Sequence, residues 1–433
     1  MSGSSSIHLI LFVFLIFGLL NVRADELPMA LPEDVSMSSE ELKKVDHVIQ
    51  KFIDDKELAG AVTIIARKGK VIHFSAQGMQ DISAAKKMEK DSIFRIYSMT
   101  KAVVSVAAMR LVEQGKLKLD VPASTYIPSI AKMKLNGKIP NREMTLRDLL
   151  SHSSGLPNNV STDRALRAAG HPSLAESNLE EIMGRLESVP LKYEPGKGWY
   201  YSFASDVVGR LVEIGSGLQL DKALRNLIFD PLGMKDTGFY VPKEKWDRFV
   251  TPYGNGLKEI TAPQPGTSGP FTFEKAPKFL SGGGGLCSTI SDYANFCQML
   301  LNKGIFNGSR ILSPTTIDFM TQNHLPNNNT LQDMGDSSFS ETRFDGAGFG
   351  LGFSVIIDQV RSGMPASLGS FSWGGMASTF FWVDPEHNLI FIFLSNRVYD
   401  SRDNRKISEL NISCLLYTSP SPRDGLLSRM PSS

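Results

Sequence analysis

The apolar and polar positions of the chain follow two different periods, and each period predicts a different kind of element. Apolar residues recur on one face of a helix at five positions: Leu42, Val45, Val48, Ile49 and Phe52. Ser38 and Glu41, just before them, have the spacing of a capping box, so this helix is expected to begin after Ser38. By contrast, 61–66 and 70–75 are apolar runs around an Arg-Lys-Gly turn, which predicts an antiparallel hairpin.

Beyond this hairpin the pattern changes from strands to helices and then back to strands. Residues 98–114 are apolar with few charges, which predicts a buried helix, and prolines break 117–280 into helices and loops. A further helix is expected over 291–301. Strand-like segments return in the last third: 350–357, 378–383 and 389–394. The chain is therefore expected to have an α+β fold, with one mixed sheet built from both chain ends and a mostly helical insertion.

The two ends of the chain differ in composition from the rest. Residues 7–22 are almost purely apolar, and 22–24 supply small residues before a plausible cut after Ala24. Residues 1–24 are therefore expected to be a secretory signal peptide, with an uncleaved membrane anchor as the alternative. From Cys414 onward the sequence CLLYTSPSPRD resembles a translated sequencing adapter. Residues 414–433 are therefore expected to be a non-native tail, with a disordered natural tail as the alternative. One folded domain then spans 25–413, and the protein is expected to be secreted.

Composition and charge exclude several kinds of partner. Lys and Arg total 46 against 45 Asp and Glu, and no basic patch with interleaved aromatic residues occurs, so a nucleic-acid partner is not expected. Cys287 and Cys297 have no partner at metal-ligand spacing and are expected to be buried free thiols. The seven histidines form no HExxH pair. Neither a metal nor another cofactor is expected, and the oligomeric state is not indicated.

Ser98 and Lys101 are the first candidates for chemistry. A serine hydroxyl is a poor nucleophile at neutral pH unless a base takes its proton, and a lysine can do so only where burial keeps it neutral. Residues three apart lie on one face of a helix, so Lys101 can reach the Ser98 hydroxyl. The free backbone N–H groups at the helix start would favour an oxyanion there. The spacing alone is common, and a helix-capping serine with a solvated lysine is the alternative.

The bend at 195–203, PGKGWYYSF, is the second candidate. A Pro-Gly turn leads into aromatic residues just before a helix that is expected to start near Ser205. A tyrosine held there beside Lys101, at position 200 or 201, could share the proton load of the lysine and relay it to a leaving group. Ordinary aromatic packing of both tyrosines is the alternative.

The segment 372–376, SWGGM, is the third candidate. Adjacent glycines at 374 and 375 let the backbone approach a ligand closely. The N–H of Met376 could then complete an oxyanion hole with that of Ser98. A glycine-rich loop or bulge at a strand edge is the alternative.

In chain order, five segments resemble the motifs of the serine β-lactamase/penicillin-binding-protein superfamily: FRIYSMTK at 94–101, LLSHSSGL at 149–156, 195–203, 282–289 and 373–375. The likeness covers about 38–413 and is nearest to the class C branch and the family VIII carboxylesterases. It implies that Ser98 is the acylated nucleophile, Lys101 its partner base and Tyr201 the second proton-transfer residue. It also implies a β-lactamase/transpeptidase-like fold, with a mixed antiparallel sheet flanked by helices and the site in the cleft between sheet and helices.

The chain departs from the penicillin-recognising members at two places. Those members usually carry Tyr-x-Asn, whereas Phe203 stands at the third position here and cannot hydrogen-bond. They also carry Lys-Thr-Gly on the strand beside the cleft, whereas the matching residues here are Trp373, Gly374 and Gly375. A substrate carboxylate thereby loses a charge-assisted hydrogen bond worth ~1.5–3 kcal/mol. Both changes are expected to make the cleft more apolar and to favour neutral esters over β-lactams.

The sequence as a whole predicts a secreted serine hydrolase that acts through an acyl-enzyme on small-molecule carboxylic esters with a short acyl chain. A β-lactamase or D-alanyl-D-alanine peptidase is the alternative within the enzymes. A catalytically silent scaffold or filament-forming relative is the alternative of another class. His152 has no GxSxG elbow beside it and is interpreted as structural. Asp206 and Asp292 are interpreted as charges at helix starts, and the alternative is that they orient neighbouring groups.

Overall fold

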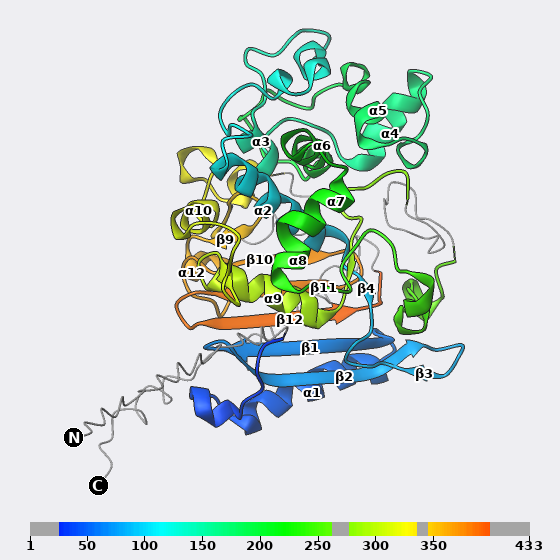
Figure 1. Cartoon of the computed structure of the whole chain (residues 1–433), viewed down its shortest axis with the longest axis vertical. Helices are drawn as coiled ribbons and strands as arrows, with labels where there is room; N and C mark the ends of the chain where they lie inside the picture. The colour runs from blue at the N-terminus through cyan, green and yellow to red at the C-terminus, as the bar shows by residue number, and fades with distance from the viewer. Residues whose placement is uncertain (1–25, 262–276, 336–344, 399–433) are drawn as a thin grey trace, which may run out of the picture.

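The computed structural model describes residues 26–261, 277–335 and 345–398, and at its centre is a sheet of eight strands. Their order is β3-β2-β1-β12-β11-β10-β9-β8, and neighbouring strands pair antiparallel (Figure 1). The strand bounds are β1 Gly60–Arg67, β2 Lys70–Asp81, β3 Lys86–Lys87, β8 Ala347–Phe349, β9 Ser354–Ile356, β10 Phe371–Gly375, β11 Thr379–Asp384 and β12 Leu389–Ser395. Ala61 of β1 pairs with Ser395 of β12, which confirms the prediction of one sheet built from both chain ends.

The middle of the chain supplies most of the helices, as predicted. In Figure 1, α3 to α7 gather in the upper half, beyond the β10 side of the sheet, while α9 lies across β11, β12 and β1. On the opposite side, α1 packs along β2. The helix bounds are α1 Ser39–Asp54, α2 Thr100–Glu113, α3 Leu146–Leu150, α4 Asn159–Ala168, α5 Leu179–Met183, α6 Ala204–Ser216, α7 Leu220–Leu224, α8 Asp230–Leu232, α9 Ile290–Leu301, α10 Pro314–Met320, α11 Leu331–Met334 and α12 Gln359–Ser362. Two short antiparallel pairs complete the fold: β4 Phe94–Arg95 with β5 Cys287–Ser288, and β6 Ile305–Phe306 with β7 Ser309–Arg310.

Helix α1 forms where the apolar periodicity predicts it. The Ser38 hydroxyl caps it by accepting the Glu41 amide at 3.3 Å, and Leu42, Val45 and Ile49 are buried on its inner face. The capping box expected at this start is only half formed, because the Glu41 carboxylate turns outward to Lys44, 2.7 Å away. The cap therefore fixes the start of the helix through Ser38 alone.

The first hairpin is confirmed, and β2 extends six residues beyond the predicted end of its strand. Its two-residue turn has positive φ angles at both positions, 52° at Lys68 and 75° at Gly69. Such a turn matches the right-handed twist of the two strands it joins, so it holds them in register. The hairpin supplies the edge of the sheet against which α1 packs.

The single strand expected over 350–357 is wrong, because 350–353 form a tight turn between β8 and β9, and only β9 lies within that range. The Gly350 amide donates to the Phe353 carbonyl at 2.8 Å, which closes the turn. Gly352 has a φ of 100°, a conformation that favours glycine. An added Cβ at Gly350 would lie 2.2 Å from the Met320 carbonyl oxygen, so a regular strand with side chains does not fit here.

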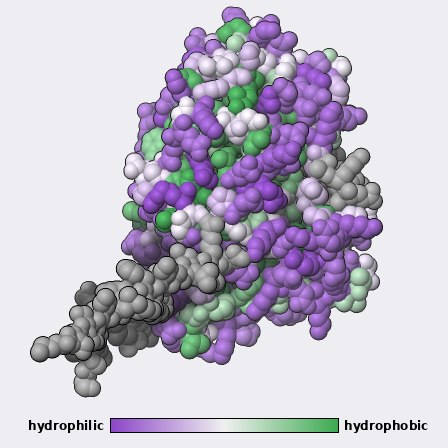
Figure 2. All heavy atoms as spheres, viewed as in Figure 1, coloured by the Kyte–Doolittle hydropathy of each residue, from purple (hydrophilic) through white to green (hydrophobic). Residues whose placement is uncertain are grey.

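One large apolar cluster joins the sheet with α2, α6 and α9. The face shown in Figure 2 is mostly hydrophilic, with scattered hydrophobic groups. Cys287 and Cys297 are buried free thiols, as predicted. In the part of the chain that the structure describes, no helix is both long and apolar enough to cross a bilayer. The expected signal peptide at 1–24 and the expected tail at 414–433 lie outside the described residues, and both stay predictions.

Candidate active site

Ser98 and Lys101 lie together at the start of α2, although not within one helix. Ser98 belongs to a single 3-10 turn, Tyr97–Met99, that leads directly into α2, and Lys101 occupies the first turn of α2. The Lys101 Nζ atom is 3.1 Å from the Ser98 Oγ atom, a hydrogen-bonding distance. Lys101 is only 6% exposed, whereas Ser98 is partly exposed among buried neighbours. The structure brings the two side chains together, and their catalytic roles stay a prediction.

The backbone around Ser98 is held firmly by the rest of the fold. Three hydrogen bonds from other elements reach it: Thr379 Oγ1 to the Ile96 carbonyl at 3.3 Å, the Leu286 amide to Thr100 Oγ1 at 3.1 Å, and the Tyr293 hydroxyl to the Met99 carbonyl at 3.0 Å. Tyr97, immediately before Ser98, has a φ of 42°. A non-glycine residue in this region carries ~1–2 kcal/mol of strain, which persists only where the surroundings enforce it. The position of Ser98 is therefore imposed by packing from β11, α9 and the 286 segment.

The amine of Lys101 has two further contacts. Its Nζ atom lies 2.6 Å from the Gly283 carbonyl oxygen and 4.4 Å from the centre of the Tyr201 ring. A neutral amine has two N–H bonds and one lone pair. It can donate to the carbonyl and to the ring face while its lone pair points at the Ser98 hydroxyl, as a base at this position requires. The role of the Gly283 carbonyl was not foreseen, because a backbone group leaves no signal except the run of four glycines around it.

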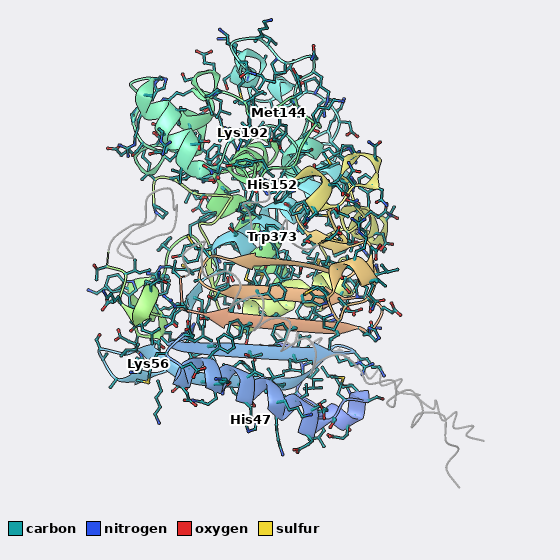
Figure 3. All side chains as sticks on the ribbon, turned by 180° about the vertical axis from the view of Figure 1, so that it is seen from behind. His47, Lys56, Met144, His152, Lys192 and Trp373 are labelled. Atoms are coloured by element: carbon teal, nitrogen blue, oxygen red, sulfur yellow. The ribbon has the colours of Figure 1, made fainter. Side chains whose placement is uncertain are left out.

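Of the two candidate tyrosines, Tyr201 is the one beside Lys101, and it lies in a cluster of aromatic rings. The Trp373 indole N–H donates to the Tyr201 phenol oxygen at 3.4 Å, and the two ring centres are 5.5 Å apart. The His152 ring centre is 5.0 Å from that of Tyr201. Figure 3 shows His152 and Trp373 one above the other, between the helical part and the sheet. Segments far apart in the sequence thus meet around the phenol.

The glycines at 374 and 375 belong to β10, so they are strand residues and not the loop that the residue pattern allowed. Gly375 packs closely on the segment before Ser98, since an added Cβ would lie 2.4 Å from the Ile96 carbonyl oxygen. Only glycine permits this approach without a backbone shift. Met376 follows β10 and is 37% exposed. Its N–H lies at the end of the strand that contacts the Ser98 segment, and its part in an oxyanion hole stays a prediction.

Phe203 is placed differently from the expectation. Its ring is 0% exposed and stacks on Phe279 with ring centres 6.4 Å apart. Phe203 directly precedes α6, and its backbone N–H donates to the Pro157 carbonyl at 2.8 Å. It therefore supports the bend of Tyr201 from within the core and offers no apolar surface to solvent, although the amide of a Tyr-x-Asn motif is still missing.

His152 is a buried member of the aromatic cluster, which agrees with its interpretation as structural. The Ser202 amide donates to His152 Nδ1 at 3.3 Å, so this nitrogen accepts and the ring proton belongs on Nε2. Burial, reinforced by the positive charge of Lys101, lowers the pKa of His152 well below its usual value. A neutral imidazole therefore packs against Tyr201.

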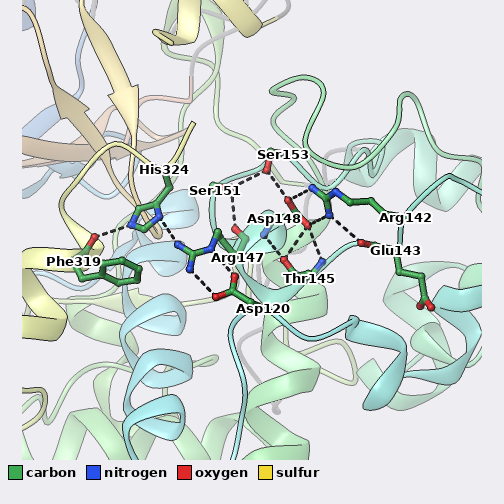
Figure 4. Close-up of polar contacts among 10 residues, drawn as sticks. All are labelled: Asp120, Arg142, Glu143, Thr145, Arg147, Asp148, Ser151, Ser153, Phe319 and His324. Carbon is green, nitrogen blue, oxygen red and sulfur yellow. Dashed lines mark hydrogen bonds and ion pairs between the residues drawn. The ribbon is translucent and has the colours of Figure 1, made fainter. Parts of the chain in front are cut away.

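A polar network fastens the loop that contains His152 (Figure 4). Arg142 and Asp148 form a two-pronged ion pair with N···O distances of 2.7 and 2.8 Å. The Asp148 carboxylate also accepts the Thr145 amide at 2.8 Å and the Ser153 hydroxyl at 3.3 Å. Because Ser153 follows His152 directly, the network that caps α3 also fixes the loop behind the aromatic cluster.

Asp206 and Asp292 do lie in the first turns of α6 and α9, as predicted, but they are not solvated charges. Both are buried, and burial raises the pKa of each carboxyl, for Asp292 to about 6. Each accepts a hydroxyl from outside its own helix: Thr237 to Asp292 at 2.8 Å, and Ser281 to Asp206 at 2.6 Å. They are cross-links within the fold, which is closer to the alternative that they orient neighbouring groups.

The arrangement supports proton transfer at a serine. A partly exposed hydroxyl, a buried amine within reach of it and a tyrosine whose ring faces the amine form a series of contacts. Such a series can take the proton from Ser98 as its oxygen attacks a carbonyl, and can deliver it to the leaving group. Within 26–261, 277–335 and 345–398, no group of three or more His, Cys, Asp or Glu side chains is placed to hold a metal ion.

Comparisons with known proteins point to the same chemistry. The Beta-lactamase family model matches residues 45–412. Protein Rv1367c of Mycobacterium tuberculosis is 34% identical over 358 residues, which cover 80% of this chain and 88% of that protein. Esterase EstB of Burkholderia gladioli is 31% identical over 376 residues, which cover 82% of this chain and 91% of EstB. The solved structure of EstCE1, described as a hydrolase with promiscuous acyltransferase activity, superposes with a TM-score of 0.73 at 28% identity, over 88% of this chain and 99% of that one.

Proposed function

The chain belongs to the beta-lactamase family as a serine hydrolase, and we propose that it cleaves carboxylic esters with a short acyl chain. The resemblance and the fold class inferred from the motifs are confirmed. The observation behind the proposal is the contact series Ser98–Lys101–Tyr201, with the Trp373 indole in place of a cation beside it. EstB and EstCE1, named an esterase and a hydrolase, support the same class of reaction.

In the first step the Ser98 oxygen attacks the ester carbonyl while its proton passes to Lys101, 3.1 Å away. A bond forms between Ser98 and the carbonyl carbon, the bond to the alkoxy group breaks, and the alcohol leaves with the proton that Tyr201 relays. The amides of Ser98 and Met376 hold the oxyanion. Water then attacks the acyl-enzyme by the same proton route, which releases the acid and restores the Ser98 hydroxyl.

The surroundings of Tyr201 support a neutral substrate. Trp373 is 3% exposed and packs edge-on against Phe349 with ring centres 5.2 Å apart. Its indole supplies an N–H but no charge, so a substrate carboxylate meets no cation at this position of β10. The missing charge-assisted hydrogen bond weakens the binding of such a substrate by ~1.5–3 kcal/mol. A β-lactamase or D-alanyl-D-alanine peptidase, the alternative enzyme, depends on that recognition. A catalytically silent scaffold would have no need of the three-group series.

We also propose that the protein is secreted, because 7–22 is apolar and the small residues Val22 and Ala24 precede a plausible cut after Ala24. Expression from the complete sequence should yield a mature protein that begins at Asp25. A membrane-bound product that retains 1–24 would favour the anchor alternative.

A substrate panel tests the proposed function. Hydrolysis of p-nitrophenyl acetate, butyrate and octanoate is compared with that of nitrocefin, a chromogenic β-lactam. We expect kcat/KM for the best short-chain ester to exceed that for nitrocefin by about 10³-fold or more, and that for octanoate by about tenfold. Nitrocefin turnover that equals ester turnover would contradict the proposal, and equal rates on all three esters would contradict the short-chain part of it.

A further inference from the structure

Asp206 is joined to Lys101 by a short path of contacts that the reaction steps above do not use. The Asp206 Oδ1 atom accepts the Ser281 hydroxyl at 2.6 Å and the Gly283 amide at 3.2 Å. The carbonyl of the same Gly283 accepts the Lys101 amine at 2.6 Å. One glycine thus bonds Asp206 through its N–H and Lys101 through its C=O.

The turn that contains Gly283 is pressed against the start of α6. An added Cβ at Gly283 would lie 2.8 Å from Asp206 Oδ2, and one at Gly282 would lie 2.4 Å from the Ser205 carbonyl oxygen. The side-chain amide of Asn159, on α4, donates to Asp206 Oδ2 at 3.1 Å. Three donors from two segments, the 281–283 turn and α4, therefore occupy the two carboxylate oxygens, and the Gly283 carbonyl has its place set by α6.

The charges of Asp206 and Lys101 are coupled inside the core. Asp206 is 0% exposed, and burial raises the pKa of its carboxyl, while its hydrogen bonds and the positive charge of Lys101 act in the opposite direction. The reciprocal effect follows, because a negative carboxylate favours the charged form of the amine. His152 faces the same amine as a buried neutral ring, and Tyr201 faces it through its ring.

The other charged groups on the helices packed against α6 have partners elsewhere or lie at the surface. On α3 and α5 the pairs are Arg147 with Asp120, Asp148 with Arg142, Glu180 with Arg210 and Glu181 with Lys278. On α2, Arg110 donates to the Leu227 carbonyl, and on α7, Asp221 and Lys222 line a separate hollow. Asp206 is therefore the buried acid that acts on Lys101.

We propose that Asp206 is a positioning residue of the reaction. Through the Ser281 hydroxyl and the Gly283 amide it holds the Gly283 carbonyl against the Lys101 amine, and its charge sets the pH above which that amine can accept the Ser98 proton. The inference rests on the proposed serine hydrolase chemistry. A purely structural cross-link, such as Asp292, would not change the pH profile of the reaction, whereas a positioning residue that acts on Lys101 would.

The test is the pH dependence of kcat/KM for p-nitrophenyl butyrate in the wild type and in Asp206→Asn, Asn159→Ala and Asp292→Asn. Removal of the negative charge favours the neutral amine, so the acid limb of the Asp206→Asn profile should move to lower pH by about one unit. Its plateau should fall roughly tenfold, because the carbonyl is held less firmly. Asn159→Ala removes one of the hydrogen bonds that lower the pKa of Asp206, so the carboxyl carries less negative charge at a given pH. The limb should therefore move in the same direction by less. Asn159 is partly exposed, so this variant keeps the test open if Asp206→Asn does not fold.

Asp292→Asn is the matched control, because Asp292 is a buried carboxylate in the first turn of another helix. It should change thermal stability without moving the acid limb. The inference is overturned if Asp206→Asn and Asn159→Ala keep the wild-type limb, or if Asp292→Asn moves it equally. The rate of labelling of Ser98 by a fluorophosphonate gives the same pH limb without ester turnover. A wild type that labels but hydrolyses no ester would therefore contradict the proposed function and still test Asp206.

Discussion

Two serine clusters lie at opposite ends of β11, and only one is arranged for catalysis. At the start of the strand, the Thr379 hydroxyl holds the segment of Ser98. At its end, the Asp384 carboxylate accepts the Ser367 hydroxyl at 2.8 Å and lies 3.1 Å from His387 Nδ1. About 17 Å of extended strand separates the two ends.

The second cluster has the residue types of a Ser-His-Asp triad but not the geometry of one. In a triad the histidine bonds the serine through one ring nitrogen and the aspartate through the other. Here Ser367 and Asp384 both contact Nδ1 of His387, and Ser367 also bonds Asp384 directly. The imidazole cannot take a proton at one nitrogen while the aspartate orients the other. Ser367 is also only 5% exposed.

The first cluster places a lysine, and not a histidine, beside its serine. Lys101 is within reach of Ser98, is itself held by the Gly283 carbonyl, and lies over the Tyr201 ring. Ser98 is partly exposed, so a substrate can reach it. The contacts and the exposure of the two serines, and not residue type alone, therefore predict that Ser98 reacts and Ser367 does not.

The largest expected effect separates the two serines. Ser98→Ala should lower kcat/KM for p-nitrophenyl butyrate by at least about 10⁴-fold, because the nucleophile is lost. Ser367→Ala, the matched control, should keep activity within about twofold and lose about 1–2 kcal/mol of unfolding free energy, because it breaks buried hydrogen bonds. Comparable losses of activity in both variants would erase the distinction between the clusters.

The next effect compares Lys101, beside Ser98, with His387, beside Ser367. Lys101→Met keeps an unbranched apolar side chain of similar length and removes the amine, so kcat/KM should fall by about 10³-fold with the melting temperature largely kept. His387→Gln should leave kcat/KM close to that of the wild type. Retention of more than about a tenth of the activity by Lys101→Met would show that another group takes the proton.

A smaller effect tests how closely β10 must approach the nucleophile segment. Gly375→Ala forces a Cβ to within 2.4 Å of the Ile96 carbonyl oxygen, so the backbone must shift and kcat should fall by about 10- to 100-fold. Gly308→Ala is the control, because nothing lies within 4 Å of an added Cβ there and its φ is 76°. It should cost about 1 kcal/mol of stability and leave kcat unchanged. Equal activity in both variants would mean that the close approach is dispensable.

The smallest effect concerns stability and tests the buried ring of His152. Because the pKa of His152 is lowered in the folded protein, the unfolded chain binds a proton that the folded one does not as the pH falls below about 6.5. The contribution of the neutral ring is fully present above that pH and is lost progressively below it. Melting temperatures at about pH 7.5 and about pH 5 should therefore differ less in His152→Gln than in the wild type. A His152→Gln variant that shows the wild-type difference would contradict the assignment.

The parts of the fold that could be predicted are those whose structure follows from the pattern of nearby residues. The inner face of α1, the β1–β2 hairpin and the buried α2 follow from periodicity and turn residues within a few positions. The turn at 350–353 could not be predicted, because it depends on the Met320 carbonyl that blocks a side chain at Gly350. β10 could not be predicted from the residue pattern either, because glycine, which occupies 374 and 375, is uncommon in strands.

The candidate site divides in the same way. Ser98 and Lys101 could be paired because their spacing is local, and Tyr201 and Trp373 could be chosen from the motif order. The contact of Lys101 with Gly283 joins residues 182 positions apart through a backbone carbonyl, which no side-chain pattern encodes. Phe203 could be identified as a departure, but its burial against Phe279 depends on packing between distant segments.

The most direct test of the central claim is peptide mapping by mass spectrometry after brief reaction of the wild type with a fluorophosphonate. The structure favours Ser98, which is partly exposed with Lys101 3.1 Å from its oxygen, over Ser367, which is 5% exposed. We expect the label on the peptide that contains Ser98 and no label there in Lys101→Met over the same time. A label on Ser367, or a wild type in which Ser98 stays unlabelled, would contradict the account.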